Sequence, residues 1–220
     1  GGTANFIIVV AKTDTEAGYK GVSLFCIETD GLEGFRRGNL LDKVGLKGQD
    51  TAELFFDEMW VPADALLGPE EGQGFIQLMQ QLPQERLQIA VQGVGVMKRA
   101  LDETITYVKE RQAFGKPIIG FQNTQFKLAE LKTKATLAEV FVHHCSERLL
   151  AGELDAATAS MAKYWVSDTQ CELVDECVQL HGGYGFMNEY PIARMWRDSR
   201  VQRIYGGTNE IMKLLISRTL

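Results

Sequence analysis

Residues 83–111 read PQERLQIAVQGVGVMKRALDETITYVKER, and this stretch carries a continuous helical repeat. Its apolar residues recur at spacings of three, four and seven, which place side chains on one face of an α-helix. They are Leu87, Val91, Val94, Leu101 and Val108. Proline suits the first turn of a helix, where the missing N–H has no partner to lose. We therefore predict a helix from about Pro83 to about Arg111.

Two more long helices follow this one. The second is predicted over residues 124–151, with an apolar stripe of Leu128, Leu131, Leu137 and Val140. The third runs from residue 156 to about 180, with Asp155 as its N-cap and a cluster of glycines after its end. Three long helices joined by short loops are typical of an antiparallel bundle.

Shorter helices are predicted near the end of the chain. One follows Pro191, and a last one covers residues 210–217, with Thr208 or Asn209 as its cap.

The first 68 residues show a strand pattern rather than a helical repeat. Short runs rich in Val, Ile and Phe are punctuated by Gly and Asp, which indicates strands over residues 5–12, 21–28 and 51–57. Roughly three strands without a fourth leave open edges and little core, so we expect part of a sheet domain. The predicted fold class is α+β: a partial antiparallel β domain followed by an all-α antiparallel helical bundle.

Composition narrows the class of protein. The 220 residues carry a formal net charge of −6, which weighs against a nucleic-acid or membrane-surface binder. The apolar run at residues 6–11 is far shorter than a membrane span, and the first residues have no signal-peptide pattern, so we expect neither feature here. The four cysteines form no CxxC pair and are interpreted as buried free thiols.

Several common motifs are absent, including GxGxxG, the Walker loop, HExxH and GxSxG. His143 and His144 are adjacent and point to different sides of a helix, so we expect no metal site there. Arginines recur every third residue at Arg194, Arg197, Arg200 and Arg203. A stripe for nucleic acid is one interpretation, but a solvated face with local Asp198 pairing fits the acidic balance better.

Four segments place glycine or a helix cap beside polar groups at helix ends. They read LPQERL (82–87), RQAFGK (111–116), QLHGGYGF (179–186) and IYGGTNEIM (204–212). Helix N-termini bind anions, because their first N–H groups lack partners and the helix dipole is positive there. Each segment alone could equally be a turn, a helix stop or a first-turn acid.

Taken together with EYPIARMWRD (189–198), these segments resemble the acyl-CoA dehydrogenases over essentially all 220 residues. The likeness is strongest to the long-chain branch and its bacterial relatives. It implies that residues 1–72 are the second part of the middle β domain and residues 73–220 the C-terminal helical bundle domain. We then expect the N-terminal helical domain to be absent and these residues alone to be inactive, binding FAD weakly or not at all.

The resemblance implies α,β-dehydrogenation of an acyl-CoA to the trans-2-enoyl-CoA, with an α-proton base and hydride transfer to FAD. In many members the base directly follows the tyrosine of the last motif, but that position is Gly206 here. In the long-chain and isovaleryl branches the base matches Glu85, so Glu85 is the expected base. Arg86, Gly206 and Gly207 are expected to bind the substrate, with the Gly206 N–H on the thioester oxygen.

The resemblance also implies the FAD contacts. The residues expected to contact the FAD of a neighbouring subunit are Arg111, Phe114, Gln122, Gln179, Gly182 and Gly183. Thr208 and Glu210 are expected to contact the FAD of their own subunit. Ala113 replaces a hydroxyl residue of some members. The implied partners are an electron-transfer flavoprotein and further copies of the chain, as a dimer or tetramer. The implied location is the cytoplasm of a bacterium or the mitochondrial matrix of a eukaryote.

Two alternatives stay open. An acyl-CoA oxidase would share the fold and pass electrons to oxygen. A non-catalytic acyl-CoA-dehydrogenase-like module acting in assembly would explain Gly206, whereas Glu85 argues against it.

Overall fold

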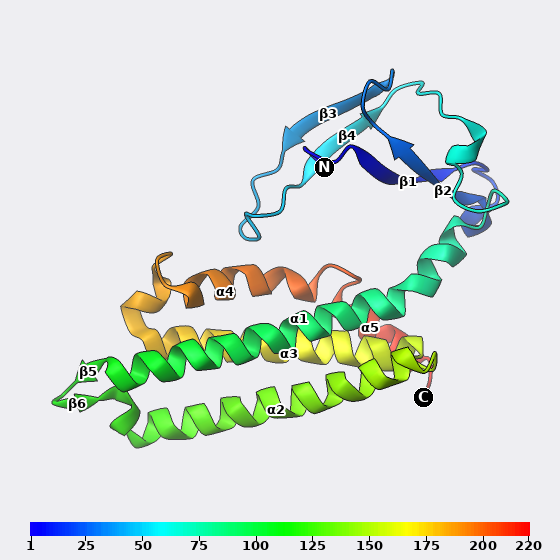
Figure 1. Cartoon of the computed structure of the whole chain (residues 1–220). Coiled ribbons are helices and arrows are strands. Elements are labelled where there is room, and N and C mark those ends of the chain that lie inside the picture. Colours follow the sequence, from blue (N-terminus) through cyan, green and yellow to red (C-terminus); the bar gives the residue numbers. More distant parts are fainter. The chain divides into compact units, whose positions relative to one another are not determined.

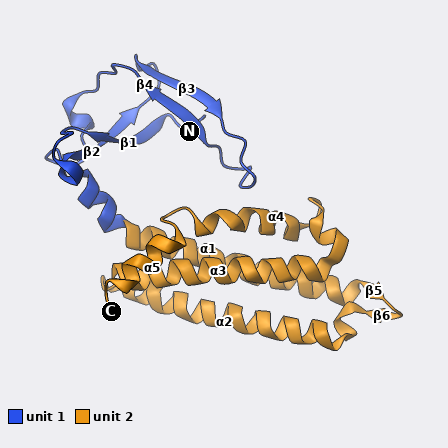
Figure 2. Ribbon diagram, turned by 180° about the vertical axis from the view of Figure 1, so that it is seen from behind, with its two compact units in different colours: residues 1–81 blue, residues 82–220 orange.

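A computed structural model describes residues 1–220, which divide into two compact units (Figure 2). The first unit comprises residues 1–81 and the second residues 82–220. This division falls inside helix α1 (Gly74–Glu110), just before Pro83. The domain boundary after residue 72 stays a prediction.

The first unit contains two separate antiparallel ladders (Figure 1). Strands β1 (Phe6–Lys12) and β2 (Val22–Glu28) pair over their whole length, from Phe6 opposite Glu28 to Lys12 opposite Val22. Strand β3 (Phe35–Leu40) pairs with β4 (Ala52–Phe56), with a register shift between Arg37 and Leu40. Every second side chain of β1 is exposed, including three large apolar ones: Phe6, Ile8 and Val10.

Strand β3 is missing from the sequence prediction, which was therefore wrong about the number of strands. Its sequence, FRRGNL, lacks alternating apolar residues and contains a glycine, so no strand pattern is visible locally. Cross-strand ring contacts stabilise it instead. The Arg36 guanidinium lies 3.9 Å from the centre of the Phe55 ring, and the rings of Phe35 and Phe56 are 5.6 Å apart.

The second unit is a helical bundle, which confirms the predicted fold class. Helices α1, α2 (Gln122–Leu150) and α3 (Ala156–His181) are its long members, and α4 (Pro191–Ser199) and α5 (Asn209–Ser217) pack on α3 (Figure 1). A two-stranded hairpin, β5 (Gln112–Ala113) with β6 (Lys116–Pro117), connects α1 to α2. Asp155 caps α3 as predicted, because its side chain accepts the Thr158 N–H at 2.8 Å.

The predicted start of α1 at Pro83 is wrong. The helix begins at Gly74, and Pro83 lies in its interior. A proline inside a helix removes one hydrogen bond, to the carbonyl four residues before it, and the helix continues here despite that loss. The added turns have a tertiary contact that no local pattern shows: the Phe75 ring lies 5.5 Å from the Tyr19 ring within the first unit.

The predicted apolar face of α2 is also partly wrong, because Leu137 and Val140 are exposed. The buried face instead carries Leu131, Ala135, Ala138, Val142 and Cys145. At about 100° per residue, these five positions lie within about 40° of Leu131, whereas Leu137 and Val140 lie on other sides. Two of the five are alanines, which let α2 approach its neighbours closely but add little to a hydrophobic pattern. On α1, Val91 lies at the edge of the predicted stripe and is 49% exposed.

The bundle core joins the long helices, and Met97 of α1 is one of its fully buried side chains. We expect Met97→Ala to lower the free energy of unfolding by about 2–5 kcal/mol, because the substitution leaves a cavity in a packed core. Val91→Ala on the same helix should change it by less than about 1 kcal/mol. Urea unfolding curves of both variants test this, and equal losses would contradict the observed burial.

Candidate functional site

The predicted site residues of the second unit fall into two groups at different levels of α3. One group surrounds the loop before α5, which contacts Lys163 of α3, while Asn209 at the start of α5 contacts Ser167. The other lies at the end of α3, from Gln179 onward. Between Lys163 and Gln179, 16 residues of helix rise by about 24 Å, so the groups form two separate sites on one chain.

Glu85 lies in the fourth turn of α1 and is exposed. The expected position near a helix N-terminus is therefore wrong, and no unpaired N–H groups of a first turn surround this carboxylate. Its neighbour Arg86 is 6% exposed. The Arg86 guanidinium donates from Nη1 to Ser160 Oγ at 3.4 Å and from Nε to the Gly206 carbonyl at 3.5 Å. Burial lowers the pKa of Arg86, and the nearby Glu85 carboxylate opposes that change.

The loop before α5 contains two glycines in succession, with φ of +66° at Gly206 and +95° at Gly207. Both angles lie in the left-handed region that favours glycine. A β-carbon on Gly206 would collide with Cδ1 of Ile89, and one on Gly207 would lie 2.7 Å from Met212 Cε. The carbonyls of both glycines accept side-chain hydrogen bonds, whereas their N–H groups have no protein acceptor.

Glu85 and this loop come together through α1. Residues four apart on a helix lie on the same face, so Glu85 shares a face with Ile89, whose side chain abuts Gly206. Arg86 adds a direct contact to the same loop. The structure therefore brings Glu85, Arg86, Gly206 and Gly207 into one region of the second unit.

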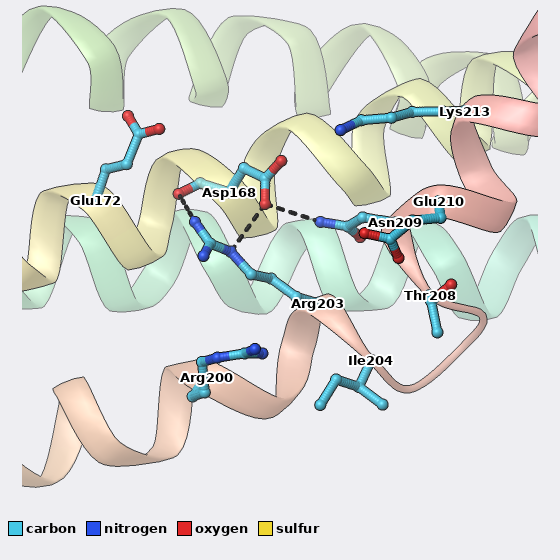
Figure 3. Close-up of a pocket in the computed structure, with 9 residues that line it drawn as sticks. All are labelled: Asp168, Glu172, Arg200, Arg203, Ile204, Thr208, Asn209, Glu210 and Lys213. Atoms are coloured by element: carbon cyan, nitrogen blue, oxygen red, sulfur yellow. Dashed lines mark hydrogen bonds and ion pairs between the residues drawn. The ribbon is translucent and has the colours of Figure 1, made fainter.

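Thr208 and Glu210 use their side chains within the first turn of α5. Of the two predicted caps, Thr208 is the N-cap, and its Oγ1 accepts the Ile211 N–H at 3.4 Å. Hydrogen bonds from the Glu210 N–H and the Thr208 hydroxyl hold the pKa of the Glu210 carboxyl below its usual range. Both residues line a cavity of about 410 Å³ (Figure 3).

One wall of that cavity is an ion-pair network that the sequence analysis missed. Arg203 Nε lies 2.8 Å from Asp168 Oδ1, and the Asn209 amide donates to the same oxygen at 3.0 Å (Figure 3). The Arg203 guanidinium also donates to the Asp168 carbonyl at 3.2 Å. Arg203 thus faces an acid of α3 rather than forming part of a solvated arginine stripe.

Lys163 of α3 is a second residue that the sequence analysis missed, and it is fully buried. Its Nζ donates to the Gly207 carbonyl at 2.7 Å and to Asn209 Oδ1 at 2.8 Å. Burial lowers its pKa to about 8, while Asp168 and Glu210 oppose that shift and Arg86 adds to it. Its position was a usable signal, because it lies on the α3 face that buries Ala159 and Val166.

The shifted pKa predicts how stability changes with pH. The folded Lys163 has a pKa near 8 and the unfolded lysine one near 10.5, so the unfolded chain binds more protons between these values. Between pH 8 and 10, the free energy of unfolding of the unmodified chain should therefore rise relative to that of the Lys163→Met variant, by up to about 3 kcal/mol. Urea unfolding of both proteins at pH 7.5, 8.5 and 9.5 measures this, and parallel pH profiles would rule it out.

The second group of residues lines a cleft of about 570 Å³ at the end of α3. Arg111, Gln179, Gly182 and Gly183 all take part, with Tyr184 beside them. The Arg111 guanidinium lies 5.6 Å from the Tyr184 ring centre and has no carboxylate partner. β-carbons on Gly182 and Gly183 would meet nothing within 4 Å, so the surface over these glycines is open.

Phe114 and Gln122 do not line this cleft, although Ala113 and Ile118 do. Phe114 is at the tip of the β5–β6 hairpin, with φ of +51° and 96% exposure. A fully exposed aromatic ring held at a tight turn is available for contact with a ligand or another subunit.

No group of three or more His, Cys, Asp and Glu side chains could hold a metal ion, and His143 and His144 are exposed. None of the helices is both long and apolar enough to cross a membrane. All four cysteines are free; Cys145 and Cys177 are buried, and burial raises the pKa of the Cys177 thiol to about 11.

Comparison with known proteins gives the family. The sequence model "Acyl-CoA dehydrogenase, C-terminal domain" matches residues 72–220. The long-chain specific acyl-CoA dehydrogenase of Sus scrofa mitochondria is 53% identical over 222 residues, which cover 100% of this chain and 51% of that protein. The chain thus spans about half the length of this curated relative.

Solved structures agree. An acyl-CoA dehydrogenase from Geobacillus kaustophilus superposes with a TM-score of 0.94 at 47% identity, covering 98% of this chain and 57% of that one. PigA, solved with FAD and proline, superposes with a TM-score of 0.92 at 27% identity, covering 99% of this chain and 56% of that one. The chain belongs to the acyl-CoA dehydrogenase family.

Proposed function

We propose that the protein containing this chain is an FAD-dependent acyl-CoA dehydrogenase that converts an acyl-CoA thioester to the trans-2-enoyl-CoA. The observation that carries the proposal is the pairing of an exposed carboxylate with unpaired N–H donors. Glu85 lies on the α1 face that abuts Gly206, and the N–H groups of Gly206 and Gly207 have no protein acceptor. A proton acceptor beside donors for an oxyanion is what removal of a proton next to a thioester requires.

Glu85 is the proposed α-proton base. A carboxylate is a weak base in water, and a bound acyl chain that excludes water would raise the pKa of such a group by desolvation. The N–H of Gly206 then donates to the thioester oxygen as negative charge develops there. Arg86 supports this arrangement, since its guanidinium donates to the Gly206 carbonyl and so helps to hold the loop.

The residues of both groups suit FAD, whose role is to accept the β-hydride. Arg111 has a guanidinium without a carboxylate partner, suited to a pyrophosphate, and open backbone at Gly182 and Gly183 admits a close ligand. Gln179, Phe114 and Gln122 are proposed to complete that contact, and Thr208 and Glu210 to contact a second FAD. The separation of the groups along α3 supports an assembly in which each FAD touches two subunits.

The relatives support further features of this proposal. The name of the Sus scrofa relative supports a long-chain substrate and, for a eukaryotic protein, the mitochondrial matrix. We propose an electron-transfer flavoprotein as the electron acceptor and a dimer or tetramer as the assembled form. The proposed domain organisation is a β domain that includes residues 1–72, followed by the helical domain of residues 73–220.

Anaerobic titration of the flavin-loaded full-length protein with saturated acyl-CoA thioesters tests the proposal. We expect the flavin absorbance near 450 nm to bleach in proportion to the thioester added, with formation of the 2-enoyl-CoA. No bleaching with any chain length would leave the non-catalytic assembly module as the better explanation. If the absorbance near 450 nm recovers rapidly when oxygen from air is the only electron acceptor, the protein is better explained as an acyl-CoA oxidase.

A further inference from the structure

We propose that Lys163 is a positioning residue, whose buried ammonium fixes the Gly206–Thr208 loop so that its N–H groups face the bound thioester oxygen. This inference rests on the proposed function. It assigns a role in the reaction to a side chain that would not itself touch substrate or flavin.

The first argument is the environment of Lys163. Its ammonium is fully buried, and its hydrogen-bond acceptors are the Gly207 carbonyl and the Asn209 side-chain oxygen, not a carboxylate. A buried cation without a directly bound anion is unfavourable for folding. An apolar side chain at this position would stabilise the fold more. We therefore infer that the lysine is present because of its hydrogen bond to the loop.

The second argument is the geometry of the loop. Two successive glycines give it unusual backbone freedom, and its N–H groups have no protein partner that would restrict it. Within this loop the two glycines are held only through their carbonyls, by Arg86 on Gly206 and Lys163 on Gly207. In a planar trans peptide the N–H points opposite to the C=O, so fixing these carbonyls fixes the N–H groups of Gly207 and Thr208. The two anchors together also restrict φ and ψ of Gly207, because these are the torsions between the two peptide planes that carry the anchored carbonyls.

The third argument is that Lys163 itself is held rigidly. Asn209 accepts its second hydrogen bond and donates through Nδ2 to Ser167 Oγ and Asp168 Oδ1, each at 3.0 Å. The charged groups around the ammonium come from three helices: Asp168 of α3, Glu210 of α5 and Arg86 of α1. The ammonium therefore connects the loop to the bundle through a fixed network, and long-range contacts of this kind are how remote residues orient catalytic groups.

The test uses Lys163→Met in the flavin-loaded full-length protein. We expect the rate of flavin reduction by saturating acyl-CoA to fall by about 10–100-fold, while the dissociation constant for acyl-CoA changes by less than about 3-fold. The second readout is independent of activity: the infrared carbonyl stretch of bound [1-¹³C]acetyl-CoA, which has no β-carbon and cannot be dehydrogenated. Its shift to lower frequency on binding, which reports polarisation of the carbonyl, should shrink by at least about half.

Lys98→Met is the matched control, because Lys98 lies on α1 and pairs with Glu139 on the outer surface of the bundle. It should leave both readouts unchanged. If Lys163→Met does not fold, Asn209→Ala carries the test, since it removes one of the two acceptors of Lys163. In Asn209→Ala the carbonyl shift should decrease by less than in Lys163→Met.

The outcomes separate the two proposals. If the unmodified protein shows neither flavin reduction nor a carbonyl shift, the proposed function is wrong. If the unmodified protein shows both, and the Lys163 or Asn209 variant retains the full shift and rate, Lys163 has no positioning role.

Discussion

Replacing Glu85 by Gln is expected to reduce the rate of flavin bleaching by acyl-CoA by about 10³-fold or more, at the upper range for loss of a general base. Glutamine has the same shape but cannot accept the α-proton. Glu85 is exposed and makes no hydrogen bond or ion pair, so the substitution removes only its electrostatic attraction to the neighbouring Arg86. Binding of acyl-CoA and the midpoint of thermal unfolding should therefore stay close to those of the unmodified protein.

Anaerobic stopped-flow absorbance at a saturating acyl-CoA concentration measures this rate. Glu103→Gln is the matched control, because Glu103 lies on the same helix and pairs with Arg99, away from the Gly206 loop. A Glu85→Gln protein that reduces its flavin within about 10-fold of the normal rate would place the base at another residue. Since Gly206 has no carboxylate, the search would then move to acids outside this loop.

The second large effect is expected from Gly206→Ala. The new β-carbon would collide with Cδ1 of Ile89, and alanine at a φ of +66° is strained whatever the space. We expect the free energy of unfolding to fall by about 1–3 kcal/mol and flavin reduction to slow by at least about 10-fold, because the strained backbone and the displaced Ile89 side chain disturb the loop. A residue with a β-carbon at position 206 would require the Ile89 side chain to shift from its position here.

A double-mutant cycle with Ile89→Ala tests the steric cause. Removing the Ile89 side chain should restore part of the loss, with a coupling energy of about 1 kcal/mol or more. Gly95→Ala on α1 is the control, since a β-carbon there meets nothing within 4 Å and should be neutral or stabilising. Additive effects of the Gly206 and Ile89 substitutions would show that the two positions do not share this space.

Both predictions concern a loop whose form depends on cations that come from other elements. Arg86 of α1 and Lys163 of α3 bind its two carbonyls. Two buried cations near one another repel, and burial disfavours each of them, which is visible in the lowered pKa of both. The chain therefore maintains an unfavourable arrangement at the place where the proposed reaction requires fixed N–H donors.

Much of the helical bundle was predictable, because helix signals are local. The N-caps at Asp155 and Thr208 and the ends of α2 and α3 follow from side chains within a few residues of each boundary. The errors arose where a contact elsewhere in the fold decides the outcome. The start of α1 and the existence of β3 both involve ring contacts with residues far along the chain.

The candidate site divides in the same way. The motif around Gly206 and the choice of Glu85 could be named from the sequence through the family resemblance, because those residues stand in recognisable segments. Lys163 and Asp168 lie within helix α3 outside any motif, so the loop and side chains that they contact are visible only in the structure.

The sequence by itself determined the fold class, the long helices and the family. The tertiary structure alone decided which face of α2 is buried, where Glu85 stands in α1, and which side chains hold the Gly206 loop. The physical reason is sequence distance. Periodicity and capping act over a few residues, whereas Arg86 and Gly206 are 120 residues apart and Lys163 and Gly207 are 44 apart. Contacts over such distances depend on how the helices pack.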